Sequence, residues 1–155
     1  MAVKPIPEGQ HTITPYLGIK DAAKAIDFYT AAFGAVVMFR LDSPDGRVGH
    51  AELKIGDSSL MLADPRDMDG GLVSSQSLSG AAIGLHLYVD DVDARFAQAI
   101  KAGATKVKAV ENQFYGDRSG TLKDPFGNLW FVSSHVEDVS VEEIRARAAK
   151  LFGGQ

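Results

Sequence analysis

The feature that most limits how this chain can fold is an internal duplication. The segment PYLGIKD (15–21) aligns with LHLYVDD (85–91), and GDSSLMLA (56–63) aligns with FGNLWFVS (126–133). The offset is about seventy residues in both alignments, which is the size of one supersecondary unit. Because the sheet of one such unit leaves a face open, each copy needs another surface to close it. The duplication therefore predicts one architecture that is used twice.

The first copy has the pattern of a strand, a helix and three more strands. A β-rich run covers residues 12–19. Asp21 stands as the predicted N-cap of a helix whose apolar residues recur at helical spacing, and Gly34 ends it. Turn residues then separate three short strand patterns. These three strands are expected at residues 35–41, 48–55 and 59–63.

The second copy repeats this order. A strand is predicted at 82–89, Asp91 is the next predicted N-cap, and Gly103 ends the second helix. A turn at residues 124–127 contains Pro and Gly. The remaining strands are expected at residues 104–110, 118–122 and 128–133.

These patterns predict an α+β fold, organised as a single domain over residues 1–155. The expected parts are a first β-α-β-β-β module (11–63), a linker rich in Asp, Gly and Ser (64–80), a second module (81–136) and a C-terminal helix (139–152). Ser140 and Glu143 have the spacing of a capping box at the start of this helix. Its apolar stripe must bury itself on a sheet edge or on a second subunit, and the sequence leaves both open.

Composition narrows the classes of function. A net charge of −4 without a cluster of Lys and Arg argues against a nucleic-acid partner. The absence of Cys excludes disulfides, thiolate metal sites and a Cys nucleophile. The N-terminus lacks the apolar region of a signal peptide, and no apolar run approaches the ~20 residues of a membrane span. We therefore expect a cytoplasmic protein with no membrane partner.

Three motifs resemble one known superfamily. They are KDAAKAIDFYTAAFGA (20–35), LYVDDVDARFAQAIKAGA (87–104) and KDPFGNLWFV (123–132). In this order over a duplicated module they resemble the vicinal oxygen chelate superfamily of glyoxalase I, extradiol dioxygenases and bleomycin-binding resistance proteins. The phrase FYGDRSGTLKDPFGNLW (114–130), followed by HVED (135–138), is similar to the PhnB-like branch. The resemblance covers about residues 12–138.

The resemblance implies that the modules pair to form a curled sheet around a cleft, usually in a homodimer. It also implies a divalent metal held by His and Glu from the first and last strand of each module. The aligned positions here are Thr14, Gly84, Leu62 (or Met61) and Phe131, and none is a usual ligand for Zn, Ni, Fe or Mn. We therefore expect no cofactor and place glyoxalase-type isomerisation and ring cleavage in doubt.

Strand alternation predicts which side chains line the cleft. Arg118, in the loop and strand after Tyr115, is able to clamp a ligand carboxylate or phosphate, although a salt bridge to Asp117 or Asp124 is the alternative. His135 and Glu137 are candidates for capping the cleft mouth. The predicted ligand-binding residues are Tyr16, His50, Glu52, His86, Tyr88, Arg118 and Phe131.

Two functions from different classes remain open at this point. The first is a binding protein that sequesters an antibiotic or another planar small molecule without a metal. The alternative is an enzyme of the lyase, isomerase or dioxygenase type. It would use a relocated divalent metal on His50, Glu52 and His86, or Glu52 and His86 as a catalytic acid-base pair. The simplest alternative is that His50 and Glu52 are solvated and His86 hydrogen-bonds locally.

Overall fold

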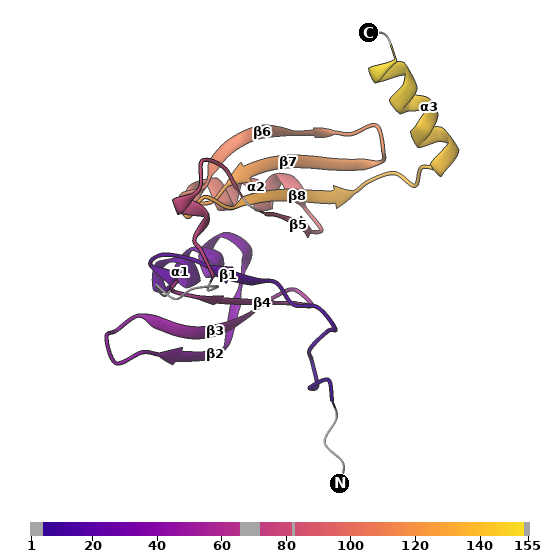
Figure 1. Cartoon of the computed structure of the whole chain (residues 1–155). Coiled ribbons are helices and arrows are strands. Elements are labelled where there is room, and N and C mark those ends of the chain that lie inside the picture. Colours follow the sequence, from indigo (N-terminus) through magenta and orange to yellow (C-terminus); the bar gives the residue numbers. More distant parts are fainter. Residues whose placement is uncertain (1–4, 66–71, 82, 154–155) are drawn as a thin grey trace. The chain divides into compact units, whose positions relative to one another are not determined.

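The computed structural model of the protein describes residues 5–65, 72–81 and 83–153. It divides into two compact units, residues 1–82 and 83–155 (Figure 1). Residues 66–71 of the predicted linker lie outside the described residues, as do residue 82, where the fifth strand was predicted to begin, and residues 1–4. Each unit is described by itself.

The first unit is one β-α-β-β-β module with a short 3-10 helix after it. Its sheet has the order β1-β4-β3-β2, in which β1 and β4 are parallel and the other neighbours are antiparallel. The elements are β1 (Tyr16–Gly18), α1 (Ala22–Phe33), β2 (Val36–Asp42), β3 (Val48–Ile55), β4 (Ser58–Ala63) and η1 (Ser75–Ser77).

The second unit repeats this topology and adds a helix. Its sheet has the order β5-β8-β7-β6, again with a parallel pair, β5 and β8. The elements are β5 (Gly84–Tyr88), α2 (Val92–Ala102), β6 (Thr105–Asn112), β7 (Asp117–Lys123), β8 (Leu129–His135) and α3 (Val141–Phe152). The predicted α+β fold of two β-α-β-β-β modules with a C-terminal helix is therefore confirmed. In the described ranges no helix is long and apolar enough to cross a membrane.

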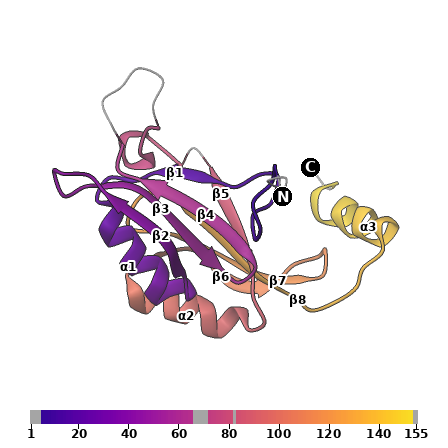
Figure 2. The same ribbon diagram turned by 90° about the horizontal axis from the view of Figure 1, so that it is seen from below.

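In each unit a helix covers one face of the sheet, as α2 does in Figure 1 and α1 in Figure 2. Burial alternates along β3, where Ala51, Leu53 and Ile55 are buried on the helix side. Tyr29 of α1 is fully buried in the same core. We call the opposite side of each sheet its open face, and it carries the polar and aromatic side chains discussed below.

The cap of α1 differs from the sequence prediction. Asp21 does occupy the cap position, but its φ of 62° is left-handed and its side chain makes no capping hydrogen bond. Asp64, directly after β4, takes this role instead. Its Oδ1 accepts from the backbone N–H of Ala22 at 3.2 Å, and its Oδ2 accepts from that of Val48 at 2.8 Å. The prediction of a local Asp21 cap was wrong because the acceptor comes from a neighbouring strand.

In the second unit a residue that is distant along the chain also caps the helix. Ser134 lies seventy positions after Asp64, and its Oγ accepts from the backbone N–H of Val92 at 2.9 Å. The same hydroxyl donates to the carbonyl oxygen of Val89 at 2.6 Å. Here the predicted local cap is also present, since Asp91 accepts from the N–H of Ala94 at 3.0 Å. The duplication therefore includes the hydrogen bond from the first residue of the helix to a side chain at the end of the last strand of each module.

Helix α3 stands beyond the turn between β6 and β7 (Figure 2). Its predicted Ser140 cap is confirmed, since Ser140 Oγ accepts from the N–H of Glu143 at 3.2 Å. Arg147 ties the helix down through both carboxylate oxygens of Glu137, at 3.1 and 2.9 Å, and the carbonyl oxygen of Phe114, at 3.2 Å. No described residue of α3 is buried, so its apolar stripe is not covered by a sheet edge of this unit. Cover by a second subunit stays a prediction.

His135 links the end of β8 to β7. It is the register partner of Asp117, whose Oδ1 lies 2.8 Å from its Nδ1, and Asp138 Oδ1 lies 2.9 Å from its Nε2. The hydrogen bonds to Asp117 and then Asp138 raise the pKa of His135 above its ordinary value. Burial pushes the pKa of Asp117 upward, but the hydrogen bonds from His135 and Tyr88 outweigh it and hold that pKa below its ordinary value.

We expect Asp64→Ala to lower the free energy of unfolding by about 2 kcal/mol, because it leaves two backbone N–H groups without their acceptor. Urea denaturation measures this loss. Asp21→Gly is the matched control. It should leave stability unchanged or raise it, since Asp21 makes no cap bond and glycine adopts positive φ freely. Equal losses in the two variants would contradict the assignment of the cap to Asp64.

The raised pKa of His135 predicts a pH-dependent stability. Its contribution is fully present below the unfolded pKa of about 6.5 and is lost as pH rises through the higher folded pKa. We expect the urea midpoint of the wild type to fall relative to that of His135→Gln as pH rises from about 6 to about 9. The lowered pKa of Asp117 acts only in acid, below this window. If the urea midpoints of the two proteins changed with pH in parallel, the contact of His135 with the two aspartates would not be ionic.

Candidate functional site

The open face of the first unit carries a chain of hydrogen-bonded side chains from β1 and β3. Tyr16 Oη lies 2.8 Å from Nδ1 of His50, and Nε2 of His50 lies 3.2 Å from Oε1 of Glu52. The second carboxylate oxygen of Glu52 accepts from the side-chain amide of Gln10 at 3.2 Å. The strand register explains this meeting, because Tyr16 and Glu52 both pair with Met61 of β4. We call Tyr16, His50 and Glu52 the relay.

The direction of the relay follows from the donors that its groups can offer. An ionised carboxylate only accepts, so Nε2 of a neutral His50 must carry the proton that it shares with Glu52. Nδ1 is then an acceptor, and the Tyr16 hydroxyl donates to it. His50 and Glu52 keep about a quarter of their side chains exposed, 25% and 27%, and Tyr16 is 41% exposed. The relay is therefore ordered by hydrogen bonds and still reachable from solvent.

The open face of the second unit carries three stacked or tilted rings, which we call the aromatic platform. The rings of His86 and Tyr88 are stacked, with centroids 4.7 Å apart and planes at 19°. The ring of Phe131 lies 6.2 Å from that of His86, at 32°. A Cβ at Gly84 would come within 2.6 Å of the Phe131 ring, so this ring lies over the glycine. The platform thus depends on the missing side chain at position 84.

Polar groups beneath the platform fix its rings. His86 Nε2 lies 2.9 Å from Ser133 Oγ, which donates to Ser119 Oγ at 2.8 Å. The Tyr88 hydroxyl donates to Asp117 Oδ2 at 2.7 Å. That hydrogen bond raises the pKa of Tyr88, because its phenolate would face a carboxylate. Ser133 and Asp117 are buried, so the rings of His86 and Tyr88 are each anchored at their polar edge.

The positions at which the superfamily holds its metal do not fit a metal. Met61, not Leu62, shares the open face with Tyr16, since Leu62 is fully buried on the helix side. Gly84 and Phe131 contact each other instead of offering donor atoms. Among the described residues there is no group of three or more His, Cys, Asp or Glu that is able to hold a metal ion. Of the proposed relocated set, His50 and Glu52 meet each other, and His86 pairs with Ser133 in the other unit.

Arg118 lies on the helix side of its sheet. Its guanidinium makes two hydrogen bonds to the carboxylate of Asp93 in α2, at 2.7 and 2.8 Å, and a third to Asn112 at 3.2 Å. Arg118 therefore forms a salt bridge, but the predicted partners Asp117 and Asp124 were wrong, because the partner is Asp93. Asp93 was missed because the pair joins residues twenty-five apart, one on a helix and one on a strand. A ligand-binding role for Arg118 would require it to exchange this partner.

The structure also locates the remaining residues that the sequence singled out, and two residues that it did not. Trp130 and Phe126 are buried, and Trp130 donates to Asp124 at 2.9 Å. Glu137 pairs with Arg147 of α3, so the predicted cap at a cleft mouth stays untested. Sequence reasoning missed Gln10 and Ser119. Alternation along β7 contained a signal for Ser119, whereas nothing in the Pro-rich start of the chain pointed to Gln10.

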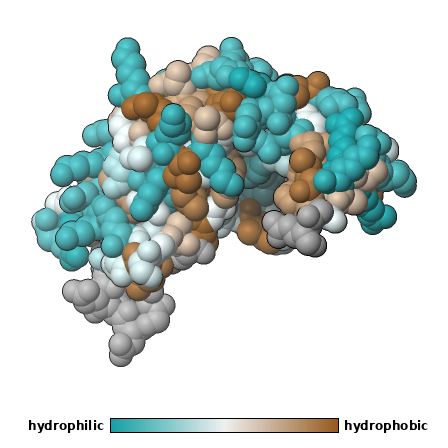
Figure 3. Space-filling view, turned by 90° about the horizontal axis from the view of Figure 1, so that it is seen from above, coloured by the Kyte–Doolittle hydropathy of each residue, from teal (hydrophilic) through white to brown (hydrophobic). Residues whose placement is uncertain are grey.

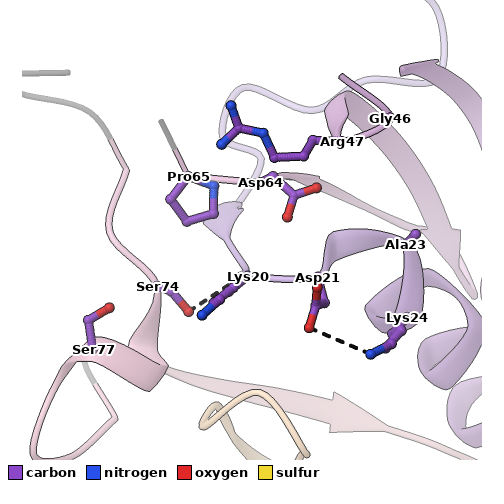
Figure 4. Close-up of a pocket in the computed structure, with 10 residues that line it drawn as sticks. All are labelled: Lys20, Asp21, Ala23, Lys24, Gly46, Arg47, Asp64, Pro65, Ser74 and Ser77. Carbon is purple, nitrogen blue, oxygen red and sulfur yellow. Dashed lines mark hydrogen bonds and ion pairs between the residues drawn. The ribbon is translucent and has the colours of Figure 1, made fainter. Parts of the chain in front are cut away.

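A hollow of about 560 Å³ lies at the start of α1 in the first unit (Figure 4). The carboxylates that line it are engaged locally. Asp21 pairs with Lys24 at 3.7 Å, and both carboxylate oxygens of Asp64 accept from backbone N–H groups. Ser74 Oγ accepts from the backbone N–H of Lys20 at 3.5 Å. These contacts tie the helix start to the segment that contains η1, so we assign this hollow a structural role. It is lined by Lys20, Asp21, Ala23, Lys24, Gly46, Arg47, Asp64, Pro65, Ser74 and Ser77.

Comparisons with known proteins agree with this architecture. An uncharacterized protein of Mycobacterium bovis is 45% identical over 136 residues, which cover 86% of this chain and 90% of that protein. TioX from Micromonospora sp. ML1 is a structural neighbour with a TM-score of 0.65 and 23% identity, over 82% of this chain and 100% of that one. TnmS3, an antibiotic-binding protein from Streptomyces sp. CB03234, has a TM-score of 0.60 and 25% identity, over 81% and 96% of the two chains.

The model of one family matches residues 10–132, which is most of the chain and covers the first module and the second up to the middle of β8. The chain belongs to the Glyoxalase/Bleomycin resistance protein/Dioxygenase superfamily.

Proposed function

We propose that the protein binds a planar small molecule by stacking it on the aromatic platform of the second unit. The observation that carries this proposal is the ordered ring ladder of Phe131, His86 and Tyr88, built over Gly84. Rings that are anchored in advance lose little conformational freedom when a ligand stacks on them, which favours binding. The antibiotic-binding neighbour TnmS3 supports an antibiotic or a similar planar compound as the ligand class.

The proposed binding needs no metal. The donor set at the four superfamily positions contains a threonine hydroxyl, a glycine, a methionine and a phenylalanine, which do not suit Zn, Ni, Fe or Mn. Assignment to the PhnB-like branch is a narrower proposal, and the phrase at residues 114–130 supports it. An enzymatic function is the second candidate, and the relay of the first unit is the specific observation in its favour.

We also propose that the protein works as a homodimer. Among the strands that the structure describes, β2 is an edge strand that pairs with β3 alone, and five of its apolar side chains are between 43% and 62% exposed. The face drawn in Figure 3, which is not the one that carries β2, also has apolar side chains at the surface between hydrophilic ones. An exposed apolar edge strand invites pairing with another chain, and a second copy that covers it removes this liability. The apolar side chains in question are Val36, Val37, Met38, Phe39 and Leu41.

The binding proposal is tested by titrating the protein with bleomycin and with a planar anthraquinone, followed by thermal shift. A ligand of the folded state raises the melting temperature with the logarithm of its concentration over its Kd. We expect Phe131→Ala to raise that Kd about tenfold, because losing one stacked ring costs about 1.4 kcal/mol. Tyr88→Leu should weaken binding by a similar factor, since it removes the other outer ring of the platform.

The matched control is Tyr16→Phe, which changes an exposed tyrosine of the first unit and leaves the platform intact. It should bind the same compounds as the wild type. Binding that is lost in Tyr16→Phe and kept in Phe131→Ala would refute the platform. About one tightly held Fe, Ni or Zn per chain, released by His50→Ala or His86→Ala, would refute metal-free binding.

The homodimer is tested by sedimentation equilibrium. We expect Met38→Lys to weaken the dimer at least about tenfold, because a charge would be buried at an apolar contact. Val107→Lys is the matched control on β6, the edge strand of the other sheet, where the side chain is exposed to a similar degree. A wild type that stays monomeric at micromolar concentration, or a larger effect of the control, would exclude β2 as the contact.

A further inference from the structure

The two units each expose one tyrosine on the open face, and the two hydroxyls donate to different acceptors. Tyr16 donates to Nδ1 of His50, which is backed by Glu52, whereas Tyr88 donates directly to the carboxylate of Asp117. Both tyrosines are exposed, Tyr16 by 41% and Tyr88 by 60%. The difference therefore lies in where each phenolic proton can go.

Loss of the Tyr16 proton to His50 creates a favourable arrangement of charges. The resulting imidazolium would stand between the Tyr16 phenolate and the Glu52 carboxylate, so that it is stabilised from both sides. The Gln10 amide holds Glu52 in place by donating to its other oxygen. At Tyr88 a phenolate would lie 2.7 Å from a carboxylate oxygen, and this contact raises the pKa of Tyr88.

The surroundings of the relay favour chemistry at Tyr16. The ring of Phe39 lies 6.1 Å from that of His50, and Met61 is the register partner of both Tyr16 and Glu52. The Phe39 ring therefore borders the imidazole. Hydroxyl, imidazole and carboxylate thus follow one another in the order by which an adjacent base activates a hydroxyl nucleophile.

We propose that Tyr16 is a nucleophile for small acyl donors, activated by His50 and Glu52. The Tyr16 oxygen forms a bond to the carbonyl carbon of the donor while its proton passes to Nδ1 of His50. The bond between that carbon and the leaving group then breaks, and the leaving group takes the proton from His50. The products are O-acyl-Tyr16 and the protonated leaving group, with no oxidant or reductant involved. This activity is separate from ligand binding by the platform, and each can fail without the other.

The probe for this proposal is N-acetylimidazole, which transfers an acetyl group to phenolic oxygens and releases imidazole. The wild-type protein is treated near neutral pH, and acetylation of each of its four tyrosines is followed by peptide mass spectrometry. We expect Tyr16 to react at least about tenfold faster than Tyr88, at the lower end of what a positioned base contributes. Exposure alone predicts the opposite order, because Tyr88 is the more exposed of the two. Hydroxylamine should reverse the modification if it is an O-acetyl ester.

Two variants separate the relay from simple accessibility. His50→Gln should slow acetylation of Tyr16 about tenfold and leave that of Tyr88 unchanged. Glu52→Gln should slow it less, because His50 remains as the base. Platform binding of the planar probes should be intact in both variants, which distinguishes failure of this proposal from failure of the binding proposal.

The proposal also predicts the tautomer of His50, and this tautomer can be determined on the wild-type protein. Nitrogen NMR at a pH at which the imidazole of His50 is uncharged should show its proton on Nε2 and not on Nδ1. A Tyr88 rate equal to or above that of Tyr16 would overturn the proposal. So would a proton on Nδ1 of His50, or an unchanged Tyr16 rate in a folded His50→Gln protein.

Discussion

The parallel pairing of the first and last strands holds both modules in register, and the positions of all open-face side chains follow from it. Tyr16 lies opposite Met61 in the first sheet, and His86 lies opposite Phe131 in the second. A parallel pair needs a crossover, and the crossover helix covers one face of the sheet, so the alternate side chains are left on the other face. A slip of one residue would exchange the two faces completely. The caps from Asp64 and Ser134 oppose such a slip because they tie the end of each last strand to the start of the crossover helix.

The same register explains why the second unit carries an aromatic surface at the two positions where the resemblance to the superfamily implies a metal. In the second unit both aligned positions lie on adjacent strands and face the same side. Gly84 leaves space above β5, and the ring of Phe131 fills it. Once Phe131 lies there, His86 has a ring on either side and is held by Ser133 below. The missing side chain at Gly84 and the position of the Phe131 ring are therefore one structural feature.

The sequence predicts those parts of the structure that depend on local periodicity. Alternation along each strand placed Tyr16, His50 and Glu52 on one face, and His86, Tyr88 and Phe131 on another, as the hydrogen bonds and ring contacts bear out. It did not predict partners that are distant along the chain. Asp64 was hidden at the edge of a loop-like segment, and Asp93 was hidden on a helix. Partner choice there depends on which strand ends meet in space, and a single sequence pattern does not contain that information.

Duplication gave the chain two copies of one frame, and the copies differ in how they treat the hydroxyl of an exposed tyrosine. In the second unit the acceptor is a carboxylate already engaged by His135, so Tyr88 keeps its proton and serves as an anchored ring. In the first unit an imidazole stands between the phenol and the carboxylate, so a proton can move without bringing two negative charges together. The inserted imidazole separates the hydroxyl of Tyr16 from the carboxylate of Glu52. One frame is in this way able to support a binding surface in one copy and a reactive group in the other.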